Sequence, residues 1–326
     1  MSATQISTDG PGLNMTEIFA PFYWGFVISL FLGGITIVQA YIYFPHPSDR
    51  KPVQIIAAIM LLLDLVSSAL IAQSLFYYLI PHYGSLAQLG SVTTELNVEC
   101  LLNATITFIS QMYFAYQIHM IKRNDRVAWF VIVVITVCAI FAFVGGIGCI
   151  TAMAIFQHGV LSNRNEKFAI FFGIAKGFGT VTDIVATVAM CIYLWSSKTG
   201  IAQTKGLIKS LIQYVINRGI VVTLLQTLLL VLFYAAPNKL YWIAAHINVT
   251  KLYANTFFAM LNARERIKQK HAGSKAISTS FFRNISDKSD KSGKDQTFSP
   301  SHDTAEAQDK PYEMPTVAKA VVIADL

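Results

Sequence analysis

The chain has 326 residues, of which 54% are hydrophobic and 13% charged, whereas soluble domains carry about 25% charged residues. Long apolar runs hold almost no charge, and the charges gather between the runs and after residue 262, which excludes a soluble globular protein. The net charge of +7 comes from residues near the ends of the runs, so it excludes nucleic-acid binding and indicates the lipid bilayer as the first partner.

Seven stretches are long and apolar enough to cross a bilayer, since a spanning helix needs about 20 mainly apolar residues. Proline-rich or charged segments, such as 45–52 and 237–239, separate them. The chain therefore predicts an all-α, polytopic membrane protein, with an N-terminal tail over 1–21 and a seven-transmembrane-helix bundle over 22–262. The expected helices are 22–44, 53–80, 96–121, 127–156, 168–195, 214–236 and 240–261.

The basic residues predict that the N-terminus lies outside and the C-terminus in the cytosol, because short cytosolic connections are enriched in Lys and Arg. With this orientation the outer connections carry only Arg164, Lys167 and Lys239. The inner connections carry Arg50, Lys51, Lys122, Arg123, Arg126, Lys198, Lys205, Lys209, Arg264, Arg266, Lys268 and Lys270. We expect a multi-pass protein of the plasma membrane, and the sequon at Asn14 predicts a glycosylated outer tail.

Two segments flank the sixth and seventh helices. In residues 201–212, apolar side chains alternate with lysines at helical spacing, which favours an amphipathic extension of the sixth helix, with a plain loop as the alternative. From residue 263 to 326 Ser, Lys, Asp, Gly and Thr dominate, which predicts a disordered cytosolic tail. Ser299 and residues 286–292 are candidate phosphorylation sites, and the tail is a candidate site for cytosolic partners.

Ionisable residues within the predicted spans are expected to face the bundle interior in pairs, since unpaired charges are costly in hydrocarbon. Asp64 and Lys251 lie at similar depth and form the favoured pair, while Asp183–Lys251 and Glu99–Lys251 remain open. Lys176 belongs to the same set of buried charges. Arg218 lies near the cytosolic interface, where we expect its side chain to snorkel to lipid phosphate.

Polar residues recur on one face of the third and seventh helices, four residues or about one turn apart. They could line a cavity open to the outside, and the alternative is that they hold the bundle together by interhelical hydrogen bonds. The candidate ligand-binding residues are Glu99, Asn103, Lys251 and Asn255.

The remaining features indicate neither an enzyme nor a cofactor. His and Cys are not spaced as metal ligands, and no nucleophile elbow, zinc-protease motif or phosphate-binding loop is present, so no metal site is expected. Aromatic residues near the helix ends are expected to form an interfacial belt. They include Tyr23, Trp24, Trp129, Trp195, Tyr241 and Trp242.

A set of motifs lies between residues 178 and 264. They are Thr180-Val181-Thr182-Asp183, Thr204 through Tyr214, Arg218-Gly219, Lys251-Leu252-Tyr253-Ala254-Asn255 and Leu261-Asn262-Ala263-Arg264. With these motifs, residues 178–264 resemble a large set of basidiomycete fungal membrane proteins that is catalogued only as a domain of unknown function. The resemblance covers about a quarter of the chain and implies a fungal seven-helix membrane protein without an established activity.

The leading functional hypothesis is a receptor-like or sensory protein that binds an unknown small molecule. It rests on the predicted topology, the polar stripe of the third helix and the long tail. A small-solute or ion transporter is the main alternative, with Asp64, Asp183 and Lys251 as its site. A non-signalling membrane scaffold, in which the charges only hold the bundle, is the third.

Overall fold

The computed structural model describes residues 15–45, 49–82, 92–122, 125–156, 166–196, 202–236 and 239–292. In this part the protein is all-α, and its helices agree with the predicted spans to within a few residues at most ends. The helices are α1 (Met15–Tyr43), α2 (Lys51–Leu79), α4 (Thr94–Ile121), α5 (Arg126–Phe156), α6 (Glu166–Ser196), α7 (Ala202–Ala235) and α8 (Tyr241–Ser292).

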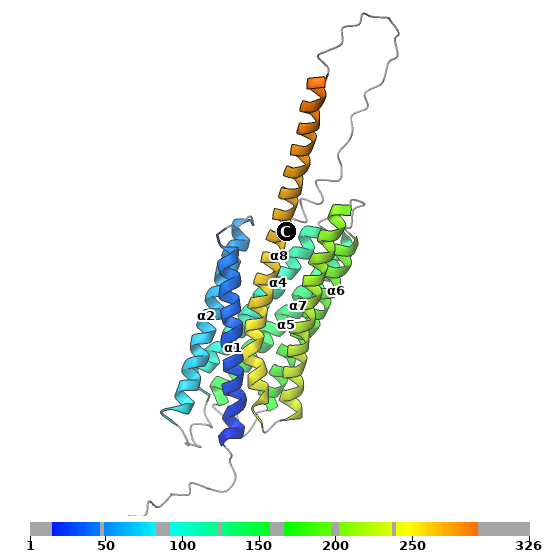
Figure 1. Ribbon diagram of the computed structural model, residues 1–326. Helices are drawn as coiled ribbons and strands as arrows, with labels where there is room; N and C mark the ends of the chain where they lie inside the picture. Colours follow the sequence, from blue (N-terminus) through cyan, green and yellow to red (C-terminus); the bar gives the residue numbers. More distant parts are fainter. Residues whose placement is uncertain are drawn as a thin grey trace, which may run out of the picture.

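The helices form one up-and-down bundle, in which successive helices run in opposite directions (Figure 1). We call the end where α1, α4, α6 and α8 begin the N-terminal end, and the opposite end, where α8 continues past the bundle, the tail end. Around the bundle each helix packs against the next in the chain, and α8 closes the ring by packing against α1.

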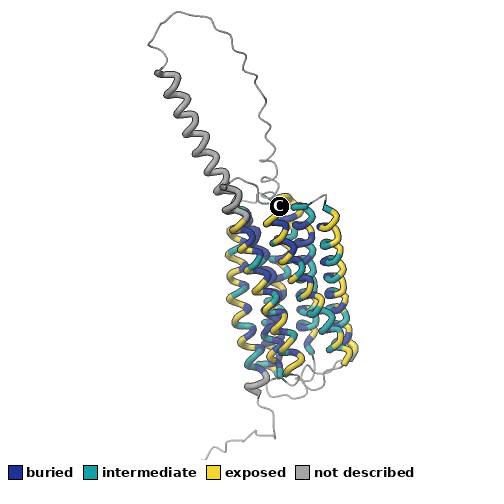
Figure 2. The backbone as a smooth tube through the Cα atoms, turned by 90° about the vertical axis from the view of Figure 1, so that its right-hand side faces the viewer, coloured by how far each residue is buried: buried dark blue, intermediate teal, exposed yellow. Residues whose placement is uncertain are grey.

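Within the described residues, five helices are long and apolar enough to cross a membrane, which indicates a multi-pass membrane protein. Their outward faces carry large apolar side chains, and buried residues follow the inner faces (Figure 2). A bilayer would remove these apolar faces from water. The five segments are Phe19–Tyr43, Lys51–Leu79, Arg126–Ile155, Glu166–Ser196 and Leu211–Ala235.

The two other helices of the bundle, α4 and α8, are more polar because they occupy its interior. α4 packs against α2, α5, α6 and α8, and α8 packs against α1, α2, α4 and α7. Their polar side chains are thereby held by other helices instead of facing lipid. The polar stripes predicted from sequence thus belong to the helices at the centre of the bundle.

A ladder of asparagines joins α8 to α1. The three asparagines of α8 are seven residues apart along the helix. Each side-chain amide donates to a main-chain carbonyl of α1, and these three carbonyls are also seven residues apart. This constant offset fixes the register of two parallel helices, as a heptad does in a coiled coil. The bonds run from Asn248 to Gly25 (3.0 Å), Asn255 to Leu32 (2.8 Å) and Asn262 to Gln39 (2.9 Å).

Two helices extend beyond the predicted boundaries. α7 begins at Ala202, so the amphipathic segment before the sixth span is helical as favoured. α8 runs to Ser292, so residues 263–292 are helical and the predicted disorder is not confirmed there. No proline interrupts the chain between residues 238 and 299, and residues 263–270 are rich in helix-forming Ala, Arg, Glu, Lys and Gln. Asn14, Ser299 and the tail beyond residue 292 lie outside the described residues.

Candidate functional site

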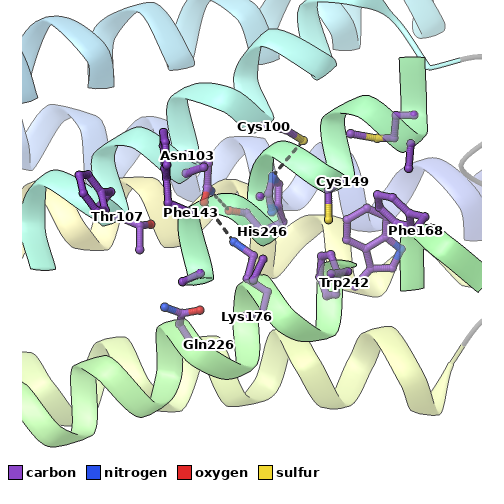
Figure 3. Close-up of a pocket in the computed structure, with 18 of the residues that line it drawn as sticks. Cys100, Asn103, Thr107, Phe143, Cys149, Phe168, Lys176, Gln226, Trp242 and His246 are labelled. Atoms are coloured by element: carbon purple, nitrogen blue, oxygen red, sulfur yellow. Dashed lines mark hydrogen bonds between the residues drawn. The ribbon is translucent and has the colours of Figure 1, made fainter. Parts of the chain in front are cut away.

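The candidate site is a cavity of about 90 Å³ between α4, α5, α6 and α8, which we call the main cavity. It extends from Val92 and Trp242 at the N-terminal end to Gln111 and Gln226 near the middle of the bundle. Figure 3 shows side chains from these helices converging on it. The main cavity therefore occupies the half of the bundle that the sequence predicts to face outside.

Aromatic and aliphatic side chains form most of its wall. Phe168 and Phe172 of α6 and Trp242 of α8 line it towards the N-terminal end, and Phe143 of α5 lines it further in. The ring of Phe172 stands at 77° to that of Trp242, with their centroids 5.6 Å apart. A wall of this kind favours an apolar ligand with few polar groups.

Lys176 of α6 brings a cation to the cavity wall. Its Nζ donates to Oδ1 of Asn103 at 3.1 Å, and in the described part of the chain no carboxylate lies within ion-pairing distance of it. Asn103 is held in place, because its Nδ2 donates to Thr250 Oγ1 at 2.7 Å and to the carbonyl of His246 at 3.2 Å. The amine is thus oriented by a neutral amide.

Beside Asn103, α4 and α8 bring together a carboxylate, a thiol and an imidazole. Nε2 of His246 lies 3.2 Å from Oε2 of Glu99 and 3.6 Å from Sγ of Cys100. Ser67 of α2 donates to the other oxygen of Glu99 at 3.3 Å. Cys100 and His246 line the cavity, and Glu99 is fully buried next to them.

A second carboxylate lies beneath the inner end of the cavity. Asp183 of α6 accepts hydrogen bonds from the amides of Gln111 at 3.4 Å and Gln226 at 3.2 Å, and from the hydroxyl of Tyr253. Both glutamines also line the cavity. Asp183 therefore meets neutral donors from α4, α7 and α8, and it forms no ion pair with a described lysine or arginine.

The ion pair between α2 and α8 lies apart from the cavity. Nζ of Lys251 is 2.8 Å from Oδ1 of Asp64, 2.7 Å from the Asp64 carbonyl and 2.6 Å from Oγ of Ser68. Both charged side chains are fully buried. Of the three partners that the sequence leaves open for Lys251, the structure places it against Asp64.

Only one of the predicted ligand-binding residues, Asn103, lines the main cavity. Glu99 is buried behind it, Lys251 faces α2, and Asn255 faces α1 through the asparagine ladder. The polar stripe of α8 thus makes interhelical hydrogen bonds, which is the alternative that the sequence left open. The stripe of α4 does reach the cavity, with Asn103, Thr107 and Gln111 in its wall.

Arg218 does not snorkel to the interface, and that prediction was wrong. Its side chain is buried, with 8% exposed, and its guanidinium donates to Ser110 at 2.6 Å and to Thr256 at 3.2 Å. Its Cζ lies 3.4 Å from the centroid of the Phe114 ring. Hydroxyls of α4 and α8 and an aromatic face together hold the cation inside the bundle.

A polar cluster at the tail end joins four parts of the chain. Arg264 of α8 forms an ion pair with Asp49, which precedes α2, at 3.3 Å and donates to the hydroxyl of Tyr113 at 2.7 Å. The hydroxyl of Tyr43, at the end of α1, donates to the same aspartate at 3.1 Å. Within this cluster α8 is tied to α1, α2 and α4 where it leaves the bundle.

Sequence reasoning missed the role of Trp242 and the meeting of Cys100 with His246. Trp242 was expected in the interfacial belt, but only 6% of it is exposed, whereas Trp24, Trp129 and Trp195 are each more than half exposed. Cys100 and His246 are 146 residues apart along the chain, so no local spacing signals their contact.

Comparison with known proteins matches part of the chain to a family of unknown function. Residues 179–266 match the model of a family of unknown function, DUF6534, which agrees closely with the span of the resemblance noted from sequence. The match runs from α6 to α8 and includes Asp183, Gln226, His246 and Lys251, but it excludes the cavity walls formed by α4 and α5. No curated protein and no solved structure matches the chain.

Proposed function

We propose that the protein is a receptor-like protein of the plasma membrane, with seven transmembrane helices, that binds a small apolar carboxylate in the main cavity. The amine of Lys176 carries this proposal, because it is a basic group in a largely apolar wall and donates its hydrogen bond to a neutral amide. An anionic ligand would neutralise it, while the aromatic wall would surround the rest of the ligand.

The proposed count of seven transmembrane helices requires that the two polar helices, α4 and α8, also cross the bilayer. α4 has 28 residues, so it is roughly 42 Å long and can cross the bilayer, and its polar side chains face other helices. The basic residues near the tail end, among them Arg50, Lys51 and Arg126, support a cytosolic tail end and an outer N-terminal end. The main cavity then receives its ligand from outside.

The size of the cavity limits the ligand. An apolar cavity of about 150 Å³ holds one benzene molecule. The main cavity, of about 90 Å³, is smaller than that, and hexanoate has more heavy atoms than benzene, so its binding requires the cavity wall to move apart. We take hexanoate as the test ligand because its chain can contact the aromatic wall while its carboxylate meets Lys176.

α8 provides the route by which a ligand would act at a distance. Its first turns place Trp242 and His246 in the cavity wall, and the same helix carries Arg264 in the tail-end cluster before it leaves the bundle. A shift of α8 on ligand binding would strain its bonds to Asp49 and Tyr113. The helix beyond the bundle would present this change to cytosolic partners.

The binding test is isothermal titration calorimetry on the detergent-solubilised protein with butanoate, hexanoate and decanoate. We expect hexanoate to bind best, and 1-hexanol, which has no charge, to bind more weakly. Lys176→Met should weaken hexanoate binding about 10- to 100-fold, because a hydrogen bond to a charged group contributes about 1.5–3 kcal/mol. Lys209→Met, which alters an exposed lysine of α7, is the matched control and should bind as the wild type does.

Equal hexanoate binding by wild type and Lys176→Met, or no binding by either, would overturn the proposed ligand. Proteoliposomes separate the receptor from a transporter. A receptor binds hexanoate without accumulating it inside the vesicle, whereas uptake that follows a proton gradient would favour transport.

A further inference from the structure

Glu99, Cys100 and His246 present three different donor atoms to one point at the edge of the main cavity. The carboxylate oxygen, the thiol sulfur and the imidazole nitrogen lie within 4.8 Å of one another. Two come from adjacent residues of α4 and the third from α8, so the point lies between the two helices at the centre of the bundle. Figure 3 shows Cys100 and His246 facing each other there.

The two distances from His246 match the edges of a tetrahedral metal site, and the third, between the Glu99 and Cys100 ligand atoms, is at most 4.8 Å. Ligands bound at about 2.0–2.3 Å from a tetrahedral ion lie about 3.3–3.6 Å apart. Nε2 of His246 is 3.2 Å from Glu99 Oε2 and 3.6 Å from Cys100 Sγ.

We infer that Glu99, Cys100 and His246 form a binding site for Zn²⁺ or a similar divalent transition metal. A thiolate with an imidazole suits zinc and disfavours Mg²⁺ and Ca²⁺, which prefer oxygen ligands. One thiolate and one carboxylate balance the two charges of the ion. The occupied site is therefore neutral, as a site buried in a bilayer requires.

The surroundings share some features with other metal sites, although among the described residues Nδ1 of His246 has no hydrogen-bond partner. Ser67 holds Oε1 of Glu99 at 3.3 Å, which leaves Oε2 free to bind the ion. Asn103 donates to the carbonyl of His246, which fixes the start of α8 relative to α4. Because Cys100 and His246 line the main cavity, the fourth position of the metal opens towards it.

The test uses the full chain, purified in detergent without a polyhistidine tag, stripped with a chelator, kept reduced and titrated with Co²⁺. We expect one equivalent to bind, with the charge-transfer absorption of a thiolate bound to cobalt. Cys100→Ser should abolish this absorption, whereas Cys149→Ser, which alters the other cysteine of the cavity wall, should retain it. Ser67→Ala should weaken binding about 10- to 100-fold, as loss of an outer hydrogen bond does at other metal sites.

The inference is overturned if the wild-type protein shows no such absorption with excess Co²⁺, or if the absorption survives Cys100→Ser. A second measurement, of cysteine alkylation, uses only the wild-type protein, so it does not depend on whether the variants fold. Zn²⁺ should slow the alkylation of Cys100 by a maleimide much more than that of Cys149, and equal rates with and without Zn²⁺ would contradict the site. The Co²⁺ titration contains no carboxylate ligand, so a failure of hexanoate to bind leaves its result unchanged.

Discussion

Replacing Lys251 by an uncharged residue should destabilise the bundle severely, because the buried carboxylate of Asp64 would lose its cation and has no access to water. Both Lys251 and Asp64 are fully buried, and the ammonium has three oxygen acceptors on α2 between 2.6 and 2.8 Å away. Lys251→Met keeps most of the side-chain volume but leaves the Asp64 carboxylate without its cation. Breaking a buried ion pair in this way costs about 3–5 kcal/mol.

The second variant, Asp64→Asn combined with Lys251→Met, removes both charges. Its remaining cost is that of an unpaired amide, about 1–3 kcal/mol, so the double variant should be more stable than Lys251→Met alone. The free energies of unfolding are compared by titrating the folded protein in mixed micelles with a denaturing detergent. A loss below about 1 kcal/mol for Lys251→Met, or a double variant less stable than the single one, would refute this reasoning.

Three further predictions use the same unfolding assay. Asn255→Ala removes one step of the ladder to α1 and should cost about 1 kcal/mol, the scale of interhelical hydrogen bonds in membranes; no loss would exclude the ladder as a stabilising feature. Gly145→Ala should cost about 1–3 kcal/mol, because its Cβ would lie 2.8 Å from the backbone nitrogen of Ala175, whereas the control Gly34→Ala has open space and should not destabilise. Arg218→Lys should cost about 1.5–3 kcal/mol, since an ammonium cannot reproduce the planar contacts with both hydroxyls and the ring; wild-type stability would contradict that geometry.

The helices could be predicted closely because their signals are local. Apolar length defines each span, and prolines or charges mark where it ends, as at Pro81 and Pro237. The depth of Asp64 and Lys251 also follows from counting residues along straight helices. Their similar depth made them the favoured ion pair. Both inferences need only the rise of a helix and the cost of a charge in hydrocarbon.

The rotation of the central helices could not be predicted. α4 and α8 carry polar residues on several faces, and either stripe could face the cavity or another helix. Asn255 faces α1, and Asn103 faces the cavity, although both looked equivalent in sequence. Rotation is set by packing with four neighbours, which local periodicity does not encode.

Residues near helix ends are ambiguous for a related reason. Trp242 and Arg218 lie where an aromatic belt or a snorkelling cation is expected, but the bundle buries both. An amphipathic side chain fits the interface and the protein interior equally well, so its position along the helix does not determine its environment. Only the neighbouring helices decide between the two.

Cysteine labelling in intact cells tests the central claim most directly, namely that the main cavity opens outside and holds a carboxylate. Met153 of α5 lines the cavity, so Met153→Cys is introduced into a chain whose native cysteines are replaced by serine. The proposal predicts that a membrane-impermeant methanethiosulfonate labels this cysteine from outside, that hexanoate slows the labelling, and that Lys176→Met removes the protection. Labelling that requires permeabilised cells, or that hexanoate leaves unchanged, would contradict the claim.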